Sequence, residues 1–447
     1  MGQPGPVTSD AIIYLPGIMG SELVDAQDRV VWGLKPSLIF RQTVFGDVLD
    51  RLALRANDGI RASQPIQFPA AIPLLSSMEP YRALETRLKS VVVAPEAVRP
   101  FAYDWRKSVA DAAEMLAPVA RAHLNHWQAR WKVLPDELKK GLPDPGLTLV
   151  GHSMGGLVAS YFAAFGEGGE KVRNVITLGT PFGGSLNAVG VLATGKAFPF
   201  GAFANSLRTA AQTLPGLYEL LARWHCVIDG KDRRALTPAD VEGLGASREL
   251  ATTAASTMAK LASAFDKPTE RTPTVRALVG VTQPTLQSVR IKDGVPEFFE
   301  SVDDTDHRGD GTVFRSAAAP PGVDPAYLPQ THGALSKTNE AIEYVAAKLT
   351  ERPFEAFLAD TAVGIRVPEV VGVDQPFLVE LLDGRPGLLC AITDIEQNQP
   401  QKLVPSKLRG GLVGAEFTAP RPGLYRISIS GGGYSPVEAL VCAMDQG

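Results

Sequence analysis

The sequence predicts an α/β protein with a mainly parallel sheet, followed by a smaller all-β domain. Two observations carry this prediction. Up to residue 361, short apolar runs alternate with amphipathic helical patterns, which is typical of a parallel sheet with helices on its faces. After residue 362 only short strand-like runs remain, separated by turn residues, and no helical period survives. We therefore expect a large domain over residues 1–361 and a β-sandwich over residues 362–447.

The first domain contains a series of apolar runs, and we expect each of them to form a strand. They lie at residues 11–15, 98–103, 147–150, 172–178 and 274–281. A helix is predicted after Ser108, where apolar residues recur at helical spacing from Val109 to Trp127. Ser108 with Asp111 three residues later is typical of a capping box, which starts a helix. The same spacing predicts a last helix that reaches Leu349.

Two insertions interrupt this alternation, at residues 32–78 and 185–273. The second is far longer than the roughly 2–6 residues of an ordinary αβ loop. Its first part, 185–222, has only three charged residues and predicts helices with an apolar face. Such a segment is either a cap over a pocket or further core. We favour a cap, because ligands of open α/β sheets bind outside the carboxyl ends of the strands.

The C-terminal region contains short apolar runs that predict strands at residues 377–382, 388–392, 414–417, 424–430 and 439–444. Glycine- and proline-containing turns separate several of them. Short strands with turns between them and no helix favour a small sandwich.

Composition excludes several classes of protein. The chain has 44 Lys+Arg against 48 Asp+Glu, a net charge of −4, and so lacks the basic excess of a nucleic-acid-binding protein. Three cysteines are too few for a disulfide scaffold. We see no signal peptide and no apolar run long enough to span a bilayer, and therefore expect a cytoplasmic protein.

The strongest motif is Gly151-His152-Ser153-Met154-Gly155-Gly156. An apolar strand leads into it and a helical pattern leads out of it. A sharp strand-to-helix turn of this kind lifts a serine hydroxyl above a sheet and needs small residues on both sides. The alternative, a structural turn with a solvent-exposed serine, does not account for this context. Ser153 is therefore the candidate nucleophile.

A serine hydroxyl needs an adjacent base. Four of the six histidines are set aside because they lie inside the turn, on the helix after Ser108 or in the long insertion: His152, His123, His126 and His225. Of the remaining two, we prefer His332 to His307. His332 lies in a loop before the last helix, and the order Ser…Asp…His of α/β-hydrolases places the base last.

The acid that orients this base should lie between Ser153 and His332. Asp310 has glycine on each side, which suits a loop that approaches another backbone closely. Its competitors are three nearby aspartates, Asp303, Asp304 and Asp306. The same stretch half-resembles a calcium loop, but Arg308 and Arg315 occupy ligand positions, so we expect no metal. We expect no cofactor either.

Acyl transfer also requires two backbone N–H donors for the oxyanion. The N–H of Met154, directly after the nucleophile, is one candidate. The other is the N–H of Ile18, in the glycine-containing loop 15–20 after the first strand.

Together these segments resemble the lecithin:cholesterol acyltransferase-like branch of the α/β-hydrolases. The resemblance runs in order through residues 14–23, 31–32, 103–106, 151–156, 177–185 and 309–313. It implies a catalytic triad of Ser153, Asp310 and His332, with an oxyanion hole at Ile18 and Met154. It also implies that the two insertions act as a membrane-touching cap and lid.

Within these segments, Trp32, Trp105 and Phe182 are our candidates for the substrate pocket. For the stretch Tyr103-Asp104-Trp105-Arg106 the alternative is a buried Asp–Arg pair beside a packed tryptophan. The C-terminal tail lies outside the family core and suits docking to a protein or a carbohydrate.

We therefore expect a serine-dependent lipid-ester hydrolase of phospholipase A type, or an acyltransferase, working through an acyl-enzyme on a lipid or other ester. The acyl acceptor, water or a second alcohol, stays open. The expected partners are a membrane surface at the cap and a protein at the C-terminal domain, with no nucleic acid. The alternative is a binding or scaffold protein on a hydrolase fold, whose C-terminal domain recruits a partner.

Overall fold

The computed structural model describes residues 7–33, 49–66, 81–195, 201–354, 363–382, 387–407, 412–431 and 434–445. Most of the first insertion, 32–78, lies outside the described residues. The expected domain boundary at residue 361 lies outside them as well.

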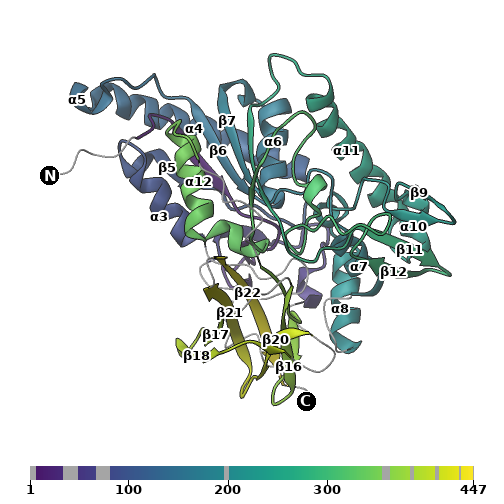
Figure 1. Ribbon diagram of the computed structural model, residues 1–447. Coiled ribbons are helices and arrows are strands. Elements are labelled where there is room, and N and C mark those ends of the chain that lie inside the picture. The colour runs from purple at the N-terminus through teal and green to yellow at the C-terminus, as the bar shows by residue number, and fades with distance from the viewer. Residues whose placement is uncertain are drawn as a thin grey trace.

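The described residues of the first domain form a six-stranded parallel sheet in the order β13-β10-β7-β6-β1-β5 (Figure 1). Its strands are β1 (Ala11–Leu15), β5 (Val98–Pro100), β6 (Leu147–His152), β7 (Val172–Leu178), β10 (Val275–Gly280) and β13 (Ala326–Leu328). The predicted parallel sheet is therefore confirmed. The second predicted strand ends early, at Pro100, and the short β13 was not predicted because three residues leave no recognisable pattern.

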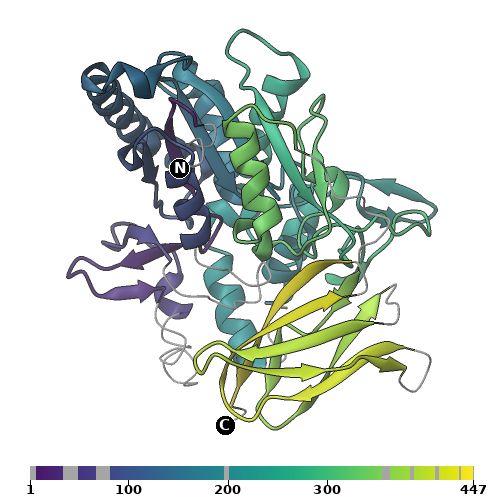
Figure 2. The same cartoon turned by 60° about the vertical axis from the view of Figure 1, so that its left-hand side comes forward.

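Helices cover both faces of this sheet, as the apolar strands require (Figures 1 and 2). The helices α3 (Arg82–Ser90) and α12 (Asn339–Leu349) pack together on one face. On the other face lie α4 (Val109–Val133), α6 (Met154–Phe165) and α11 (Arg248–Asp266). Ser108 caps α4, since its Oγ accepts a hydrogen bond from the Asp111 N–H at 3.0 Å. Among the described residues no helix is long and apolar enough to cross a bilayer.

The second insertion is helical in its first part, as predicted. It contains α7 (Leu186–Thr194), α8 (Gly201–Ala211), α9 (Pro215–Tyr218) and α10 (Pro238–Gly243), and ends in α11. Helix α11 packs against α6, where Lys260 Nζ donates to the Tyr161 hydroxyl at 3.2 Å.

A second sheet, with strand order β12-β11-β8-β9, was not predicted. Its strands are β8 (Val227–Asp229), β9 (Asp232–Arg234), β11 (Ser288–Lys292) and β12 (Val295–Phe299). They are short, and β9 consists of Asp-Arg-Arg, so neither hydrophobicity nor alternation marks them.

The C-terminal region forms two facing sheets, as predicted, with strand orders β14-β16-β20-β19 and β15-β22-β21-β17-β18. The strands are β14 (Gly364–Arg366), β15 (Val370–Gly372), β16 (Pro376–Leu382), β17 (Leu388–Asp394), β18 (Gln399–Leu403), β19 (Ser406–Lys407), β20 (Val413–Thr418), β21 (Gly423–Gly431) and β22 (Tyr434–Met444). Alternate residues of both sheets, such as Val379 and Ile427, are fully buried in one shared core.

One carboxyl group is buried at the start of α4. Glu219 is only 2% exposed, and its Oε2 accepts a hydrogen bond from the Val109 N–H at 2.5 Å. Burial raises the pKa of Glu219 to about 7, against the opposing effect of the Val109 N–H. The positive end of the helix favours the anion, but burial outweighs it.

The raised pKa of Glu219 predicts that the folded protein loses stability as the pH rises. Because the pKa of this carboxyl is higher in the folded protein than in the unfolded chain, the folded state binds the proton more tightly. Its contribution is thus fully present below the unfolded pKa and is lost as the pH rises through about 7. Between pH 5 and pH 8, the urea midpoint should fall more in the wild type than in Glu219→Gln. The control is Glu114→Gln, which changes an exposed glutamate of α4, and an equal fall in all three proteins would contradict the assignment.

Candidate active site

Ser153 lies in a strained turn between β6 and α6. Its φ of 52° and ψ of −127° are rarely adopted by residues other than glycine. The turn is held to β7 by a hydrogen bond from the Ser153 N–H to the Leu178 carbonyl at 2.9 Å. Gly155 leaves room for the neighbouring loop, because a Cβ there would lie 2.3 Å from the Pro16 carbonyl oxygen. The sequence-predicted elbow is therefore present, with its serine 2% exposed.

The structure brings Ser153, His332 and Asp310 into one chain of hydrogen bonds. The Ser153 hydroxyl lies 2.9 Å from His332 Nε2, and His332 Nδ1 lies 2.7 Å from Asp310 Oδ2. With Nδ1–H donating to the carboxylate, Nε2 is left as the acceptor for the serine hydroxyl. His332 and Asp310 are each 1% exposed. All three lie beyond the carboxyl ends of the parallel strands, where ligands of such sheets bind.

Backbone N–H groups hold the Asp310 carboxylate in place. Its Oδ1 accepts hydrogen bonds from Thr312 N–H at 2.9 Å and Val313 N–H at 2.7 Å. The His332 N–H also donates to the Asp310 carbonyl at 2.8 Å, so the acid and base loops are joined through their backbones. Only Oδ2 faces the imidazole, and its direction is set by these contacts.

The competing residues lie elsewhere. Asp303 pairs with Arg233, and Asp306 accepts a hydrogen bond from the Gln287 side chain at 2.7 Å. The His307 ring packs edge-on against Phe314, with ring centroids 6.1 Å apart. In the described parts of the chain no group of His, Cys, Asp and Glu is arranged to hold a metal.

Gly179, at the end of β7, allows the acid and base to approach the sheet. Its φ of 57° is left-handed, and a Cβ there would lie 3.0 Å from Asp310 Oδ2 and 3.1 Å from His332 Nδ1. A larger residue would press on the hydrogen bond between them. The need for glycine at this position arises from the tertiary structure.

The loop after β1 passes beside the serine. A Cβ on Gly17 would lie 3.0 Å from Ser153 Cβ. Within the described residues, neither the Ile18 N–H nor the Met154 N–H donates a hydrogen bond. Met154 begins α6, so its N–H belongs to the positive end of that helix.

A second hydrogen-bonded chain was missed by the sequence reasoning. The Gly17 N–H donates to the Tyr81 hydroxyl at 2.9 Å, and this hydroxyl lies 2.8 Å from His152 Nδ1. His152 Nε2 in turn lies 3.0 Å from the His332 carbonyl oxygen. Tyr81 therefore links the loop after β1, the elbow and the base loop. No sequence signal marks it, because a single tyrosine far from every motif carries no pattern.

The protonation of His152 follows from its surroundings. Burial, and to a lesser degree the nearby His332, lower the pKa of His152 to about 3, so the ring is neutral at physiological pH. Because a carbonyl can only accept, Nε2 carries the proton and Nδ1 accepts from Tyr81. Burial raises the pKa of Tyr81, which keeps the hydroxyl proton for this bond.

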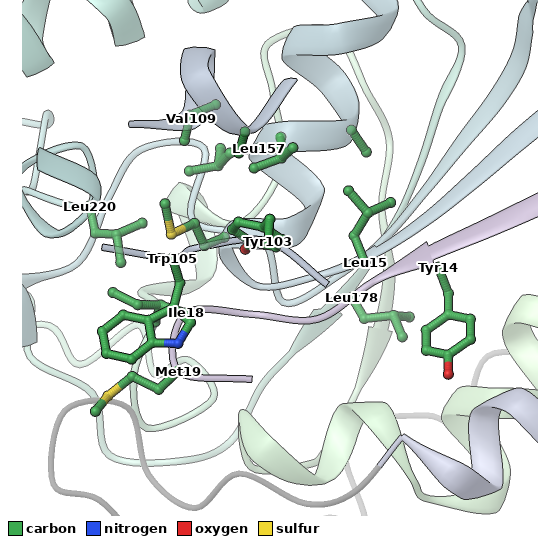
Figure 3. Close-up of a cluster of buried hydrophobic side chains, with 14 of the residues drawn as sticks. Tyr14, Leu15, Ile18, Met19, Tyr103, Trp105, Val109, Leu157, Leu178 and Leu220 are labelled. Carbon is green, nitrogen blue, oxygen red and sulfur yellow. The ribbon is translucent and has the colours of Figure 1, made fainter. Parts of the chain in front are cut away.

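Two of the candidate pocket residues lie beside the loop after β1. Trp105 lies against Ile18 and Met19 (Figure 3), and its ring meets Trp32 edge-on at 5.9 Å. Both indoles donate to backbone carbonyls and are buried. Phe182 is half-buried and packs edge-on against Phe265 of α11, with centroids 5.8 Å apart.

For residues 103–106 the structure agrees with the alternative interpretation, a buried Asp–Arg pair beside a packed tryptophan. The Arg106 side chain is fully buried. It forms a two-armed ion pair with Asp104, at 2.9 and 2.8 Å, and bonds Asp58 at 2.8 Å. Two carboxylates surround this buried guanidinium and stabilise its charge.

The bridging role of Tyr81 can be tested with Tyr81→Phe. Removing the hydroxyl leaves the Gly17 N–H and His152 Nδ1 without their partner, which should cost about 1–3 kcal/mol of unfolding free energy. The measurement is urea unfolding, with the ring ¹⁵N shifts of His152 reporting its tautomer. Tyr344→Phe is the control, since the buried Tyr344 makes no hydrogen bond through its hydroxyl among the described residues. Equal losses in both variants would contradict the bridge.

Residues 51–233 match the model of the family "Lecithin:cholesterol acyltransferase". None of the curated proteins compared with the chain matches it. The matched segment contains Ser153 and Met154, while Ile18, Asp310 and His332 lie outside it.

Solved structures with a similar arrangement include the lipase BlEst2 of Bacillus licheniformis in its propeptide form. It is 14% identical, the match covers 99% of this chain and 95% of that one, and the TM-score is 0.40. The mature form of that lipase is 15% identical, with 78% and 94% covered and a TM-score of 0.37. The phospholipase PlaB of Legionella pneumophila is 9% identical, with 98% and 92% covered and a TM-score of 0.30.

The family match confirms the resemblance deduced from the motifs. Over residues 51–233 this chain is similar to the lecithin:cholesterol acyltransferase family, and its central sheet and flanking helices form an α/β-hydrolase fold.

Proposed function

We propose that this protein is a serine-dependent lipid-ester hydrolase or acyltransferase that works through an acyl-enzyme. The observation that carries the proposal is the chain of hydrogen bonds from Ser153 through His332 to Asp310, at 2.9 and 2.7 Å. A nucleophile, a base and an orienting acid in this order are what acyl transfer by a serine requires. The match to the lecithin:cholesterol acyltransferase family supports lipid esters as the substrate class.

In the first step His332 Nε2 takes the hydroxyl proton as Ser153 Oγ attacks the ester carbonyl. Asp310 keeps the proton of the ring on Nδ1 and stabilises the imidazolium that forms. Two backbone N–H groups donate hydrogen bonds to Asp310 Oδ1 and stabilise the negative charge of the carboxylate, so Oδ2 is available to the His332 ring. The transfer of the proton from Ser153 to His332 therefore needs little movement of heavy atoms.

The negative charge on the tetrahedral carbonyl oxygen needs donors. The N–H groups of Ile18 and Met154 are our candidates. Met154 directly follows Ser153, Ile18 directly follows Gly17, which lies beside Ser153, and neither N–H has an acceptor among the described residues. The positive end of α6 adds to their effect. Each such donor is worth about 10²–10³ in rate.

Protonated His332 then gives its proton to the departing alcohol, and the acyl group stays on Ser153. Water or a second alcohol attacks this acyl-enzyme, with His332 again as the base. Exclusion of water from the site favours transfer to an alcohol, whereas an open site favours hydrolysis.

The apolar side chains near the oxyanion loop are suited to an acyl chain. Ile18, Met19 and Trp105 are buried there and belong to one cluster of hydrophobic side chains (Figure 3). We propose that this cluster forms one wall of the substrate pocket. The roles of the two insertions as cap and lid, and a membrane contact through them, remain predictions.

Replacing Ser153 with alanine tests the nucleophile. Ser153→Ala should abolish labelling by a fluorophosphonate probe and the burst of alcohol from a p-nitrophenyl ester. Ser160→Ala is the matched control, because Ser160 is a fully buried serine of α6, the helix that follows Ser153, and its hydroxyl has no partner among the described residues. Labelling retained in Ser153→Ala would refute the assignment. A folded wild type that takes no label would favour the binding or scaffold alternative.

Replacing Asp310 with asparagine tests the acid. Asp310→Asn should reduce kcat by about 10³–10⁴, because the amide donates to Nδ1 and favours the wrong tautomer of His332. The fold should persist, as judged by the urea midpoint. Asp303→Asn, a change at a mostly exposed competitor, should leave kcat unchanged. If the two variants behaved in the opposite way, the acid would be Asp303.

A further inference from the structure

Two buried glutamines join the first domain to the C-terminal β domain, defined here as residues 363–445. Gln283 follows β10 and is 1% exposed, and Gln330 follows β13 and is 2% exposed. Both side-chain amides are used to bind backbone of the β domain. Buried amides require such partners, so the two contacts are built into the folded state.

The two contacts have the same geometry. Gln283 Nε2 donates to the Val363 carbonyl at 3.4 Å, and its Oε1 accepts from the Ile365 N–H at 3.0 Å. Gln330 Nε2 donates to the Pro436 carbonyl at 3.0 Å, and its Oε1 accepts from the Glu438 N–H at 3.1 Å. In each case one amide binds the carbonyl of one residue and the N–H of the residue two positions later. A neighbouring parallel strand makes the same pair of bonds.

Both amides bind strand edges that no strand covers among the described residues. β14 is the outer strand of its sheet. β15 pairs with β22 only from Cys442 to Met444, which leaves the edge at Pro436 and Glu438 to Gln330. Each glutamine thus satisfies edge groups that would otherwise lack partners.

Each glutamine is also close in the chain, or bonded, to a sequence neighbour of a residue of the proposed triad. The Gln283 N–H donates to the Gly309 carbonyl at 2.9 Å, and the Gly309 N–H returns a bond at 3.1 Å, immediately before Asp310. Gln330 lies two residues before His332. Between them the Thr331 hydroxyl donates to the Glu438 carbonyl, so the base loop is bound to β22 at successive residues.

Further contacts strengthen this junction. Lys337 pairs with Glu438, and β22 packs against the short 3-10 helix Gly333–Ser336 that begins right after His332 (Figure 1). Apolar residues of the β domain, among them Leu424 and Met444, belong to the hydrophobic core of the first domain. The junction therefore combines polar contacts with apolar residues that both domains share in one core.

We infer that the C-terminal β domain is a structural part of the catalytic apparatus, in which Gln283 and Gln330 are positioning residues that hold Asp310 and His332 at bonding distance. This inference rests on the proposed function for its effect on rate. The acid and base loops leave the sheet at different strands, and the β domain binds both. A displacement of about 1 Å at either loop can cost about 10²-fold in rate.

The test compares the full-length wild type with Gln283→Met and Gln330→Met. Methionine has a similar length and fills the same space, but it cannot make these hydrogen bonds. Gln128→Met is the matched control, since the Gln128 amide donates to the Pro145 carbonyl at 3.1 Å at the opposite end of the sheet. All variants are assayed well below their urea midpoints, so that only folded protein is compared.

The first measurement does not depend on turnover. The proton between His332 Nδ1 and Asp310 should give a low-field ¹H NMR resonance, which should move upfield or disappear in both glutamine variants and persist in the control. The second is kinetic, with a soluble short-chain ester. The kcat of both variants should fall about 10- to 100-fold while KM changes by less than about twofold, because substrate contacts are unchanged.

Folded variants that keep the resonance and a kcat within about twofold of the wild type would overturn the inference. If a methionine variant does not fold, Thr331→Val, which removes only the hydroxyl bond to Glu438, carries the same two measurements. An unchanged resonance and kcat there would overturn it equally. A wild type without Ser153-dependent turnover would end the proposed function alone, because the resonance still tests whether the β domain positions the pair.

Discussion

In the proposed triad, the hydrogen bond between Asp310 and His332 decides whether the hydroxyl of Ser153 has a base. These two residues lie on separate loops, after different strands of the central sheet, and neither loop contains regular structure at the point of contact. A serine proton can be taken only by an imidazole whose Nε2 is free of hydrogen, and the carboxylate ensures this by binding Nδ1–H. Much of the architecture around the carboxyl end of the sheet keeps this 2.7 Å contact in place.

Three sets of contacts restrain the pair from different sides. Backbone N–H groups hold the carboxylate, and Gly179 lets both side chains lie close to β7. The chain from Gly17 through Tyr81 and His152 reaches the carbonyl of His332 itself. His152, next to the proposed nucleophile, therefore acts as a hydrogen-bond bridge. Because its lowered pKa keeps the ring neutral, it places no positive charge beside His332.

The structural role that we infer for the C-terminal domain goes beyond the docking of a partner that its added β-sandwich suggested, which stays a prediction. A domain that only bound a partner would need an exposed face and a simple linker. Here its strand edges are satisfied by Gln283 and Gln330, and part of its apolar surface joins the main core. Its stability and the geometry of the proposed triad are therefore coupled, since neither side of the junction can move without leaving buried amides unpaired.

The sequence by itself determined the parallel sheet, the sandwich, the elbow at Ser153 and the choice of His332 and Asp310. These depend on local period, on turn residues and on chain order, all of which are readable along one dimension. Only the tertiary structure decided the rest. Tyr81, Gln283 and Gln330 belong to no sequence motif, and the strands β8 and β9 show no clear hydrophobic pattern. The ion pair of Arg106 with Asp58, which lies in the first insertion, could not be predicted either. Such contacts arise between segments far apart in the chain, and their partners are chosen by burial and by the need of each buried polar group for a hydrogen bond, which no local pattern encodes.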